Sequence, residues 1–272
     1  MKALLVVVLS LVVSPATSQK MLVPSHVGPL SGDVYIVCPG HGGKDPGSHW
    51  QFGADKQVFW EASYTYPISW EFGQKLAEKG ALVYFTTFSP SLMSLNPNSA
   101  QKALPLPRDA RFVATGKQVV AGTRGNRQRM NWTQKIWKTY HKTRRVVYLA
   151  IHIDAMPPGW KGAHVCVDTR TKGSPWVARV IADELAHSGN GRRHDGQAKA
   201  MVAKERNLYD LNHRHNPVPE RALIELGTPI DQNDSWRIRD REARGKLLDH
   251  IIKALEKCHK SRPKRRLSFL FN

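Results

Sequence analysis

The sequence predicts an α/β fold in which a mixed, mostly parallel central sheet is flanked by helices. Three short apolar runs rich in β-branched residues are typical of buried strands: "DVYIVC" (33–38), "RVVYLAIHI" (145–153) and "RALIELG" (221–227). Segments with helical spacing of apolar residues separate these runs along the chain. Strands that alternate with helices indicate a layered α/β architecture with parallel neighbours.

The segment after the first strand predicts a helix that closes at a glycine. Apolar residues recur there every four positions, the spacing of one helix face, at Trp60, Tyr64, Ile68, Phe72 and Leu76. Gly80 stands at a helix C-terminal position, and Pro67 should kink this helix or mark its effective start. The run "ALVYFTT" (81–87) follows as a second strand.

The remaining chain predicts one irregular segment, three further helices and one further strand. Residues 88–125 show no clear period and are dense in Ser, Asn and Pro, so we expect a long loop or an inserted subdomain. Helices are expected over residues 127–141, 174–189 and 238–258, and a strand over residues 163–168.

The two ends of the chain differ in composition from its middle. Residues 1–18 hold one lysine, an apolar run and then small residues, which predicts a signal peptide cut after Ser18. A short linker (19–31), one main domain (32–258) and a basic tail (259–272) follow in the predicted organisation. We therefore expect an exported protein, periplasmic or secreted, without a transmembrane segment in the mature chain.

The charge of the chain is strongly positive, with a net charge of +19, an excess that the whole chain shares and that is densest at the C-terminal end. Such a field attracts anionic polymers such as nucleic acid, acidic lipid surfaces or cell-wall polymers, or does no more than keep the protein soluble. Export makes nucleic acid the least expected of these partners. Cys38, Cys166 and Cys258 are widely spaced, which allows one disulfide and argues against cysteine-ligated zinc.

Ionisable residues lie near the carboxyl ends of the three most distinct strands. His41 follows the first strand within a glycine-rich stretch, His152 lies near the end of the second, and Glu225 near the end of the third. In open α/β sheets the ligand site lies outside the carboxyl ends of the strands. A lone histidine in a glycine-rich loop is more often a hydrogen-bonded loop residue, but a histidine and a carboxylate within apolar strands need partners. The coincidence predicts a site at this edge.

Two histidines and a carboxylate form a suitable ligand set for a catalytic zinc ion, with a fourth position left for water. Zinc lowers the pKa of bound water to about 7, and a carboxylate that does not bind the metal can accept the proton of that water. Glu61, which lies among aromatic residues in "VFWEASY", is the candidate for the further carboxylate. The residues alone leave open which carboxylate binds the metal and which is the base.

These motifs resemble those of the zinc-dependent N-acetylmuramoyl-L-alanine amidases of type 3. The stretch "IVCPGHGGKDPG" is similar to the family's strand ending Asp-Pro-Gly-His-Gly-Gly, which Asp-Pro-Gly follows. "AIHID" is similar to its Ser-Ile-His-Ala-Asn motif, and "PERALIELG" to its closing Pro-Ala-Val-Leu-Val-Glu-x-Gly motif. Glu61 precedes Gly80 at the distance that the family keeps between its metal-binding glutamate and the corresponding glycine. The resemblance spans residues 33–258.

The resemblance implies an amidase domain with a zinc-exopeptidase or phosphorylase/hydrolase-like fold and one zinc ion per chain. By this resemblance His41, Glu61 and His152 are the zinc ligands, and Glu225 is the general base. The implied reaction is hydrolysis of the amide bond between N-acetylmuramic acid and L-alanine of the stem peptide. Peptidoglycan is then the substrate, and anionic cell-wall polymers are expected binding partners.

The chain departs from the family pattern in several places. Cys38 replaces the usual Asp, so a hydrogen-bond partner of a zinc-binding histidine should be lost or replaced. The second strand lacks the usual arginine, and "LGTPIDQND" follows Glu225 where a Phe and a Ser-Asn pair are expected. Residues 88–125 exceed the family's minimal connection, so they are a candidate for an autoinhibitory or substrate-shaping element.

Two alternative functions also fit the residues. One is a zinc carboxypeptidase-like or deacylating hydrolase on the same scaffold, which would leave the glycan–peptide bond intact. The other is a non-catalytic protein that binds the cell wall or other polyanions. The departures from the family pattern favour this alternative, whereas the retention of the three implied zinc ligands and the implied base argues against it.

Overall fold

The computed structural model describes residues 21–52, 56–93, 103–154, 156–168, 170, 174–192, 202–204 and 208–261. The predicted signal peptide lies outside these residues, as do nearly all of the predicted basic tail and part of the insertion at 88–125. Within the described ranges, no helix has both the length and the apolar character needed to cross a membrane.

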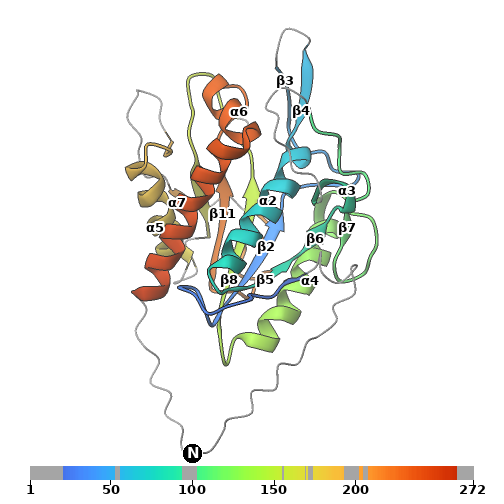
Figure 1. Cartoon of the computed structure of the whole chain (residues 1–272). Coiled ribbons are helices and arrows are strands. Elements are labelled where there is room, and N and C mark those ends of the chain that lie inside the picture. The colour runs from blue at the N-terminus through green and yellow to red at the C-terminus, as the bar shows by residue number, and fades with distance from the viewer. Residues whose placement is uncertain are drawn as a thin grey trace, which may run out of the picture.

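Seven strands of the described chain form the central sheet in the order β1-β5-β2-β8-β11-β9-β10 (Figure 1). In this order they comprise Met21–Leu22, Leu82–Phe85, Asp33–Pro39, Arg145–His152, Glu220–Glu225, His164–Val167 and Val202–Lys204. Strands β5, β2, β8 and β11 are mutually parallel, β1 and β9 are antiparallel to β5 and β11, and β10 is parallel to β9. The predicted mixed, mostly parallel sheet is confirmed.

Helices cover both faces of this sheet (Figure 1). Helices α2 (Glu61–Glu78), α5 (Ser174–His187) and α7 (Arg241–Lys260) pack on one face, and α4 (Gly122–Tyr140) packs on the other. The sheet can be covered twice because its strands are apolar on both sides, as expected for parallel strands buried between helices.

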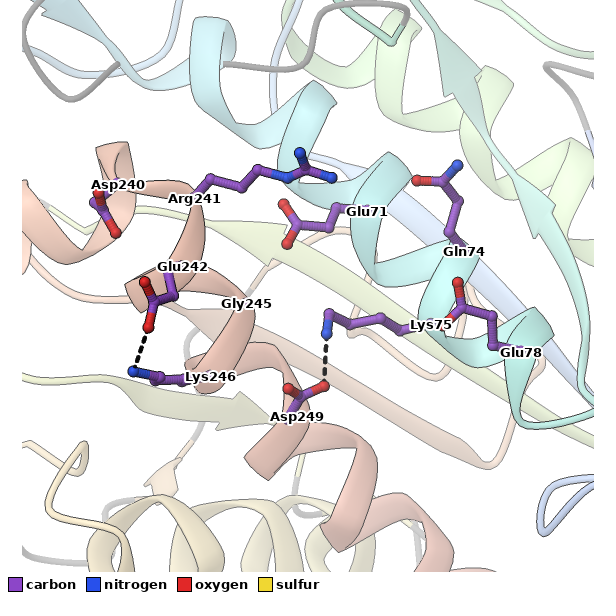
Figure 2. A pocket seen from close by; sticks show the side chains of 10 residues that line it. All are labelled: Glu71, Gln74, Lys75, Glu78, Asp240, Arg241, Glu242, Gly245, Lys246 and Asp249. Atoms are coloured by element: carbon purple, nitrogen blue, oxygen red, sulfur yellow. Dashed lines mark hydrogen bonds and ion pairs between the residues drawn. The ribbon is translucent and has the colours of Figure 1, made fainter. Parts of the chain in front are cut away.

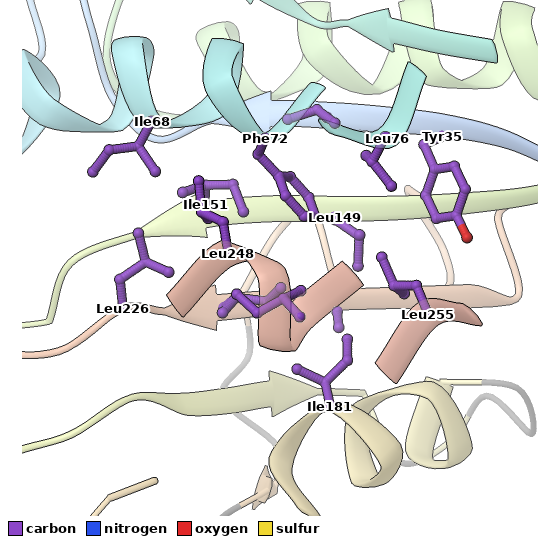
Figure 3. Packing of buried hydrophobic residues seen from close by; sticks show 14 of the residues in the cluster. Tyr35, Ile68, Phe72, Leu76, Leu149, Ile151, Ile181, Leu226, Leu248 and Leu255 are labelled. Carbon is purple, nitrogen blue, oxygen red and sulfur yellow. The ribbon is translucent and has the colours of Figure 1, made fainter. Parts of the chain in front are cut away.

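The larger of the two cores lies between the sheet and helices α2, α5 and α7. Figure 3 shows Phe72 of α2 and Leu248 of α7 packed with Leu149 of β8. Along β2, Tyr35 belongs to this core, and its neighbour Ile36 belongs to the core on the α4 face. This alternation is the period of two that a strand imposes on its side chains.

Helix α2 begins at Glu61, so Pro67 lies inside the helix and does not mark its start. A proline in a helix interior costs about 3 kcal/mol. Ile68, Phe72 and Leu76 are fully buried on the same stripe, and burial of each such side chain contributes about 1.5–3 kcal/mol. The apolar stripe therefore outweighs the proline. Gly80 follows the helix end with φ 90°, as its predicted position requires.

The prediction of the last helix is wrong in its first part. Two helices, α6 (Gln232–Arg239) and α7, replace the single helix that we expected over residues 238–258. Asp240 separates them with an extended backbone, and its carboxylate accepts a hydrogen bond from the backbone N–H of Ala243 at 2.9 Å. This N-cap begins a new helix at the point where the apolar stripe alone suggested continuity.

Two small two-stranded antiparallel sheets were not predicted. Strands β3 (His49–Phe52) and β4 (Gln57–Trp60) pair directly before α2. Strand β6 (Thr87–Phe88), which begins at the last residue of the second predicted strand, pairs with β7 (Arg111–Phe112) inside the expected irregular segment. That segment also holds the short helix α3 (Pro90–Met93).

The insertion is shorter than predicted at its C-terminal end, because α4 begins at Gly122 and the helix was expected from residue 127. Asp109 accepts hydrogen bonds from two residues near the start of the insertion, from the Ser89 hydroxyl at 2.5 Å and from the Ser91 amide at 2.8 Å. These contacts tie the described parts of the insertion together. An autoinhibitory role for the insertion stays a prediction.

A groove of about 630 Å³ lies between α2 and α7 on the outer surface (Figure 2). Its walls carry charged side chains, and Lys75 of α2 reaches Asp249 of α7 at 2.7 Å. Beside it, Arg244 of α7 lies 2.9 Å from Glu71 of α2. These ion pairs link the two helices.

Candidate metal centre

Three side chains from distant parts of the chain meet at the carboxyl edge of the sheet. His41 lies in the loop after β2, Glu61 is the first residue of α2, and His152 is the last residue of β8. Glu61 Oε2 lies 3.1 Å from His41 Nε2, and Glu61 Oε1 lies 3.0 Å from His152 Nδ1. One ligand atom from each residue falls within 4.8 Å of the others, so the three can converge on one ion.

Glu61 is buried at the centre of this cluster. Its carboxylate also accepts hydrogen bonds from the backbone N–H groups of Ser48 and Ile153, each at 3.1 Å. Burial raises the pKa of Glu61, but hydrogen bonds with His152 and His41 outweigh this effect and hold the pKa well below its usual value. Glu61 is therefore an anion at neutral pH.

The charge of the carboxylate also acts on His41. Burial lowers the pKa of His41, whereas hydrogen bonds with Asp45 and Glu61 raise it to about 10. The two carboxylates thus favour a proton on His41. A metal ion would replace that proton, because a histidine ligand must be neutral.

Glu225 lies beside the cluster as the last residue of β11. It pairs in register with His152 of β8, and only 6% of its surface is exposed. His41, His152 and Glu225 thus lie at one edge of the sheet, as we predicted from the usual position of ligand sites in α/β sheets. Glu61 lies between the two imidazole rings, whereas Glu225 does not belong to the group of three.

The residues present fit a zinc ion. Two imidazole nitrogens and one carboxylate oxygen are ligands that zinc accepts at catalytic centres, where a further position remains for water. The low pKa of Glu61 keeps this ligand deprotonated, as metal binding requires. Within the described residues, this is the group of metal-ligating side chains that could hold an ion.

The match to a protein family covers most of the chain. Residues 36–257 match the family model described as N-acetylmuramoyl-L-alanine amidase. The chain belongs to this family. The resemblance drawn from the sequence motifs is therefore confirmed, and we refer to the chain below as the amidase.

Individual relatives agree with this assignment. The amidase is 24% identical over 229 residues to the germination-specific N-acetylmuramoyl-L-alanine amidase of Bacillus subtilis (strain 168), which covers 84% of this chain and 80% of the relative. It is similar to the CwlD amidase from Clostridioides difficile in complex with the GerS lipoprotein, with a TM-score of 0.55, 18% identity, and coverage of 82% and 96% of the two chains. For the amidase Ami1 from Mycobacterium smegmatis the TM-score is 0.57, the identity 18%, and the coverage 86% and 99%. The two structural likenesses show a shared fold.

Buried side chains fix the backbone that carries His41. His41 has φ 61°, a left-handed conformation that is uncommon for a residue other than glycine. Its carbonyl oxygen accepts hydrogen bonds from Arg129 at 2.5 Å and from the Tyr66 hydroxyl at 3.1 Å. The hydroxyl of Thr65 donates to the carbonyl of Gly40 at 2.7 Å. These bonds hold the loop in a conformation that directs His41 toward Glu61.

Two glycines leave the space in which the cluster forms. A Cβ atom at Gly40 would lie 2.8 Å from His152 Nδ1, and one at Gly47 would lie 2.8 Å from Glu61 Oε2. Gly47 also has φ 70°, which any other residue would adopt only with strain. The glycine-rich character of this loop is thus a requirement of the site.

The replacement of the usual Asp by Cys38 has a visible outcome. The Cys38 sulfur accepts a hydrogen bond from Arg129 at 3.1 Å, and the carboxylate partner of His41 is Asp45, whose Oδ1 lies 3.1 Å from His41 Nδ1. Asp45 belongs to the Asp-Pro-Gly that the family motif also contains, so the loss or replacement of the partner at position 38 stays a prediction. All three cysteines of the chain are buried and free, so the disulfide that the sequence allowed does not form.

Sequence reasoning missed the roles of Arg129 and Asp45. Arg129 is only 6% exposed, and it lies on the face of α4 that buries Gly125 and Thr133. An arginine at this spacing on a buried helix face was an available signal, because a buried guanidinium needs several acceptors. Asp45 stood within the first motif but carried no assigned role.

Proposed function

We propose that the amidase hydrolyses the amide bond between the lactyl group of N-acetylmuramic acid and L-alanine of the stem peptide, with one zinc ion per chain. In this proposal His41, Glu61 and His152 hold the zinc ion, and Glu225 is the general base. The observation that carries it is the cluster of two half-buried histidines, His41 and His152, around the buried Glu61, with Glu225 on the adjacent strand. Family membership supports the substrate class.

Zinc at this site would polarise the scissile carbonyl and lower the pKa of a water molecule to about 7. Glu225 accepts a proton from the attacking water and delivers it to the nitrogen of the leaving L-alanine. The water oxygen remains on the carbonyl carbon of the lactyl group, and the C–N bond breaks. A buried carboxylate next to the proposed zinc ligands suits both proton transfers, because a general base must lie within hydrogen-bonding reach of the proton that it accepts.

The remaining residues of the site hold these groups in place. The Asp45 carboxylate contacts His41 Nδ1, which leaves Nε2 directed toward Glu61. The amides of Ser48 and Ile153 fix the two oxygens of Glu61 separately. Such outer partners typically change metal affinity or activity about 10- to 100-fold when removed.

The location of the enzyme is part of the proposal. An N-terminal signal peptide (1–18) would direct the amidase out of the cytoplasm, where its polymeric substrate lies. The net charge of +19, with a contribution from the basic tail (259–272), would hold the enzyme on anionic wall polymers. This attraction weakens with salt, because such charges are screened within about 10 Å at 0.1 M ionic strength.

Removal of the metal should abolish turnover, and zinc should restore it. The expected result is that the chelated protein releases no L-alanine amino groups from an N-acetylmuramoyl pentapeptide, whereas one equivalent of zinc per chain restores full release. Magnesium should not restore activity, since it prefers six oxygen ligands. An amine-reactive dye follows the release of amino groups, mass spectrometry identifies the products, and elemental analysis follows the metal.

The same assay separates the alternatives. Unchanged release of amino groups after the metal has been removed would contradict a zinc enzyme. Release of a free C-terminal amino acid, with the bond to the lactyl group intact, would instead indicate the carboxypeptidase-like alternative. A protein that binds no zinc would favour the non-catalytic binding protein.

A further inference from the structure

A second histidine lies next to Glu225 and has no part in the reaction described above. His164 is the first residue of β9 and is completely buried. It is the direct strand partner of Glu225 across the β11–β9 pair, and Glu225 pairs with His152 on its other side. One carboxylate thus lies between two histidines at the same level of the sheet.

The three side chains point to the same face of the sheet. Two residues earlier on β11, Leu223 pairs with Ala150 and Cys166, and all three belong to the core on the α4 face. Side chains two positions apart along a strand share a face, so Glu225 and its partners lie on this side also. Directly opposite residues have Cβ atoms about 4.5–5.5 Å apart. The His164 ring and the Glu225 carboxylate are therefore direct neighbours on this face of the sheet.

An acidic residue of a neighbouring loop also lies close to His164. Its Nε2 lies 3.5 Å from Asp154 Oδ2, and the Asp154 amide donates to the carbonyl of Gly227 at 3.1 Å. Asp154 follows β8 and Gly227 follows β11, so this contact joins the two loops that flank the site. The buried imidazole thus lies near two carboxylates, those of Glu225 and Asp154, which limits the orientations of its ring.

We propose that His164 is a positioning residue that fixes the carboxylate of Glu225 for proton transfer, with Asp154 holding the imidazole. The inference rests on the proposed function, in which Glu225 is the base. A glutamate has three side-chain torsions, and a base that turns away from the reacting atoms loses much of its effect. A rigid neighbour with a nitrogen donor restricts that rotation.

The experiment compares His164→Phe and His164→Ala with the wild-type enzyme on an N-acetylmuramoyl pentapeptide. We expect kcat to fall about 10- to 100-fold, with KM and the zinc content unchanged. Cys166→Ala is the matched control, because Cys166 lies on the same face of the same strand and pairs with Leu223 in place of Glu225. This control should retain wild-type kcat.

A double-mutant cycle separates positioning from a structural role. In a Glu225→Gln background, His164→Phe should lower kcat less than about twofold, because the group that it positions is already gone. An equal loss in both backgrounds, or a single variant with wild-type kcat, would overturn the inference. Where His164→Phe does not fold by circular dichroism, the smaller His164→Ala gives the same cycle. An inactive wild-type enzyme would instead overturn the proposed function and this inference with it.

Discussion

Glu225→Gln should retain its zinc and its fold and lose almost all turnover. The substitution keeps the size of the side chain and removes its capacity to accept a proton. General acid–base groups contribute about 10²- to 10⁴-fold to catalysis, so we expect kcat to fall by that factor. Metal binding should not change, because His41, Glu61 and His152 form the ligand cluster without Glu225.

Three measurements check this result together. Steady-state turnover gives kcat, elemental analysis gives the zinc content, and thermal unfolding reports on the fold. Glu78→Gln is a suitable control, because Glu78 lies exposed on α2. Near-normal turnover of Glu225→Gln would show that another group is the base.

His41→Ala should lose the metal and, with it, activity. The substitution removes one of the three proposed ligands and also frees the two carboxylates, Asp45 and Glu61, that its ring contacts. Removal of a residue that only hydrogen-bonds to a metal ligand lowers metal affinity about 10- to 100-fold. We expect the loss of His41 to lower zinc affinity by more than this. Activity at limiting zinc should fall in parallel.

Competition against a zinc-binding dye measures this affinity. His26→Ala is the control, because His26 is exposed in the N-terminal segment and lies outside the cluster. A His41→Ala protein that binds one zinc ion as tightly as the wild type would remove His41 from the ligand set. The contrast with Glu225→Gln then distinguishes a ligand from a base.

The sheet and the position of the site were predictable from local patterns. Short apolar runs rich in β-branched residues indicate buried parallel strands. Because ligand sites lie at the carboxyl ends of such strands, His41, His152 and Glu225 were expected at one edge of the sheet. The direction of β9 was not predictable, because the apolar pattern of a short strand is the same in either direction. The break at Asp240 was missed for a related reason, since the apolar stripe continues across it.

The supporting residues of the site were harder to predict. Asp45 and Arg129 act through contacts with His41 and with the loop around it, and Arg129 comes from a helix 88 residues further along the chain. The spacing of Arg129 on its helix could indicate a buried arginine, but the acceptors that it meets depend on the packing of α4 against the sheet. The division of roles between Glu61 and Glu225 also came from the family resemblance, because either carboxylate suited either role by its residue type.

Mass spectrometry of purified peptidoglycan digested by the wild-type amidase tests the central claim most directly. The account predicts free stem peptides that begin at L-alanine, together with glycan strands whose muramic acids carry free lactyl carboxylates. Stem peptides that remain attached to the glycan, in a digest with the zinc-loaded enzyme, would contradict it.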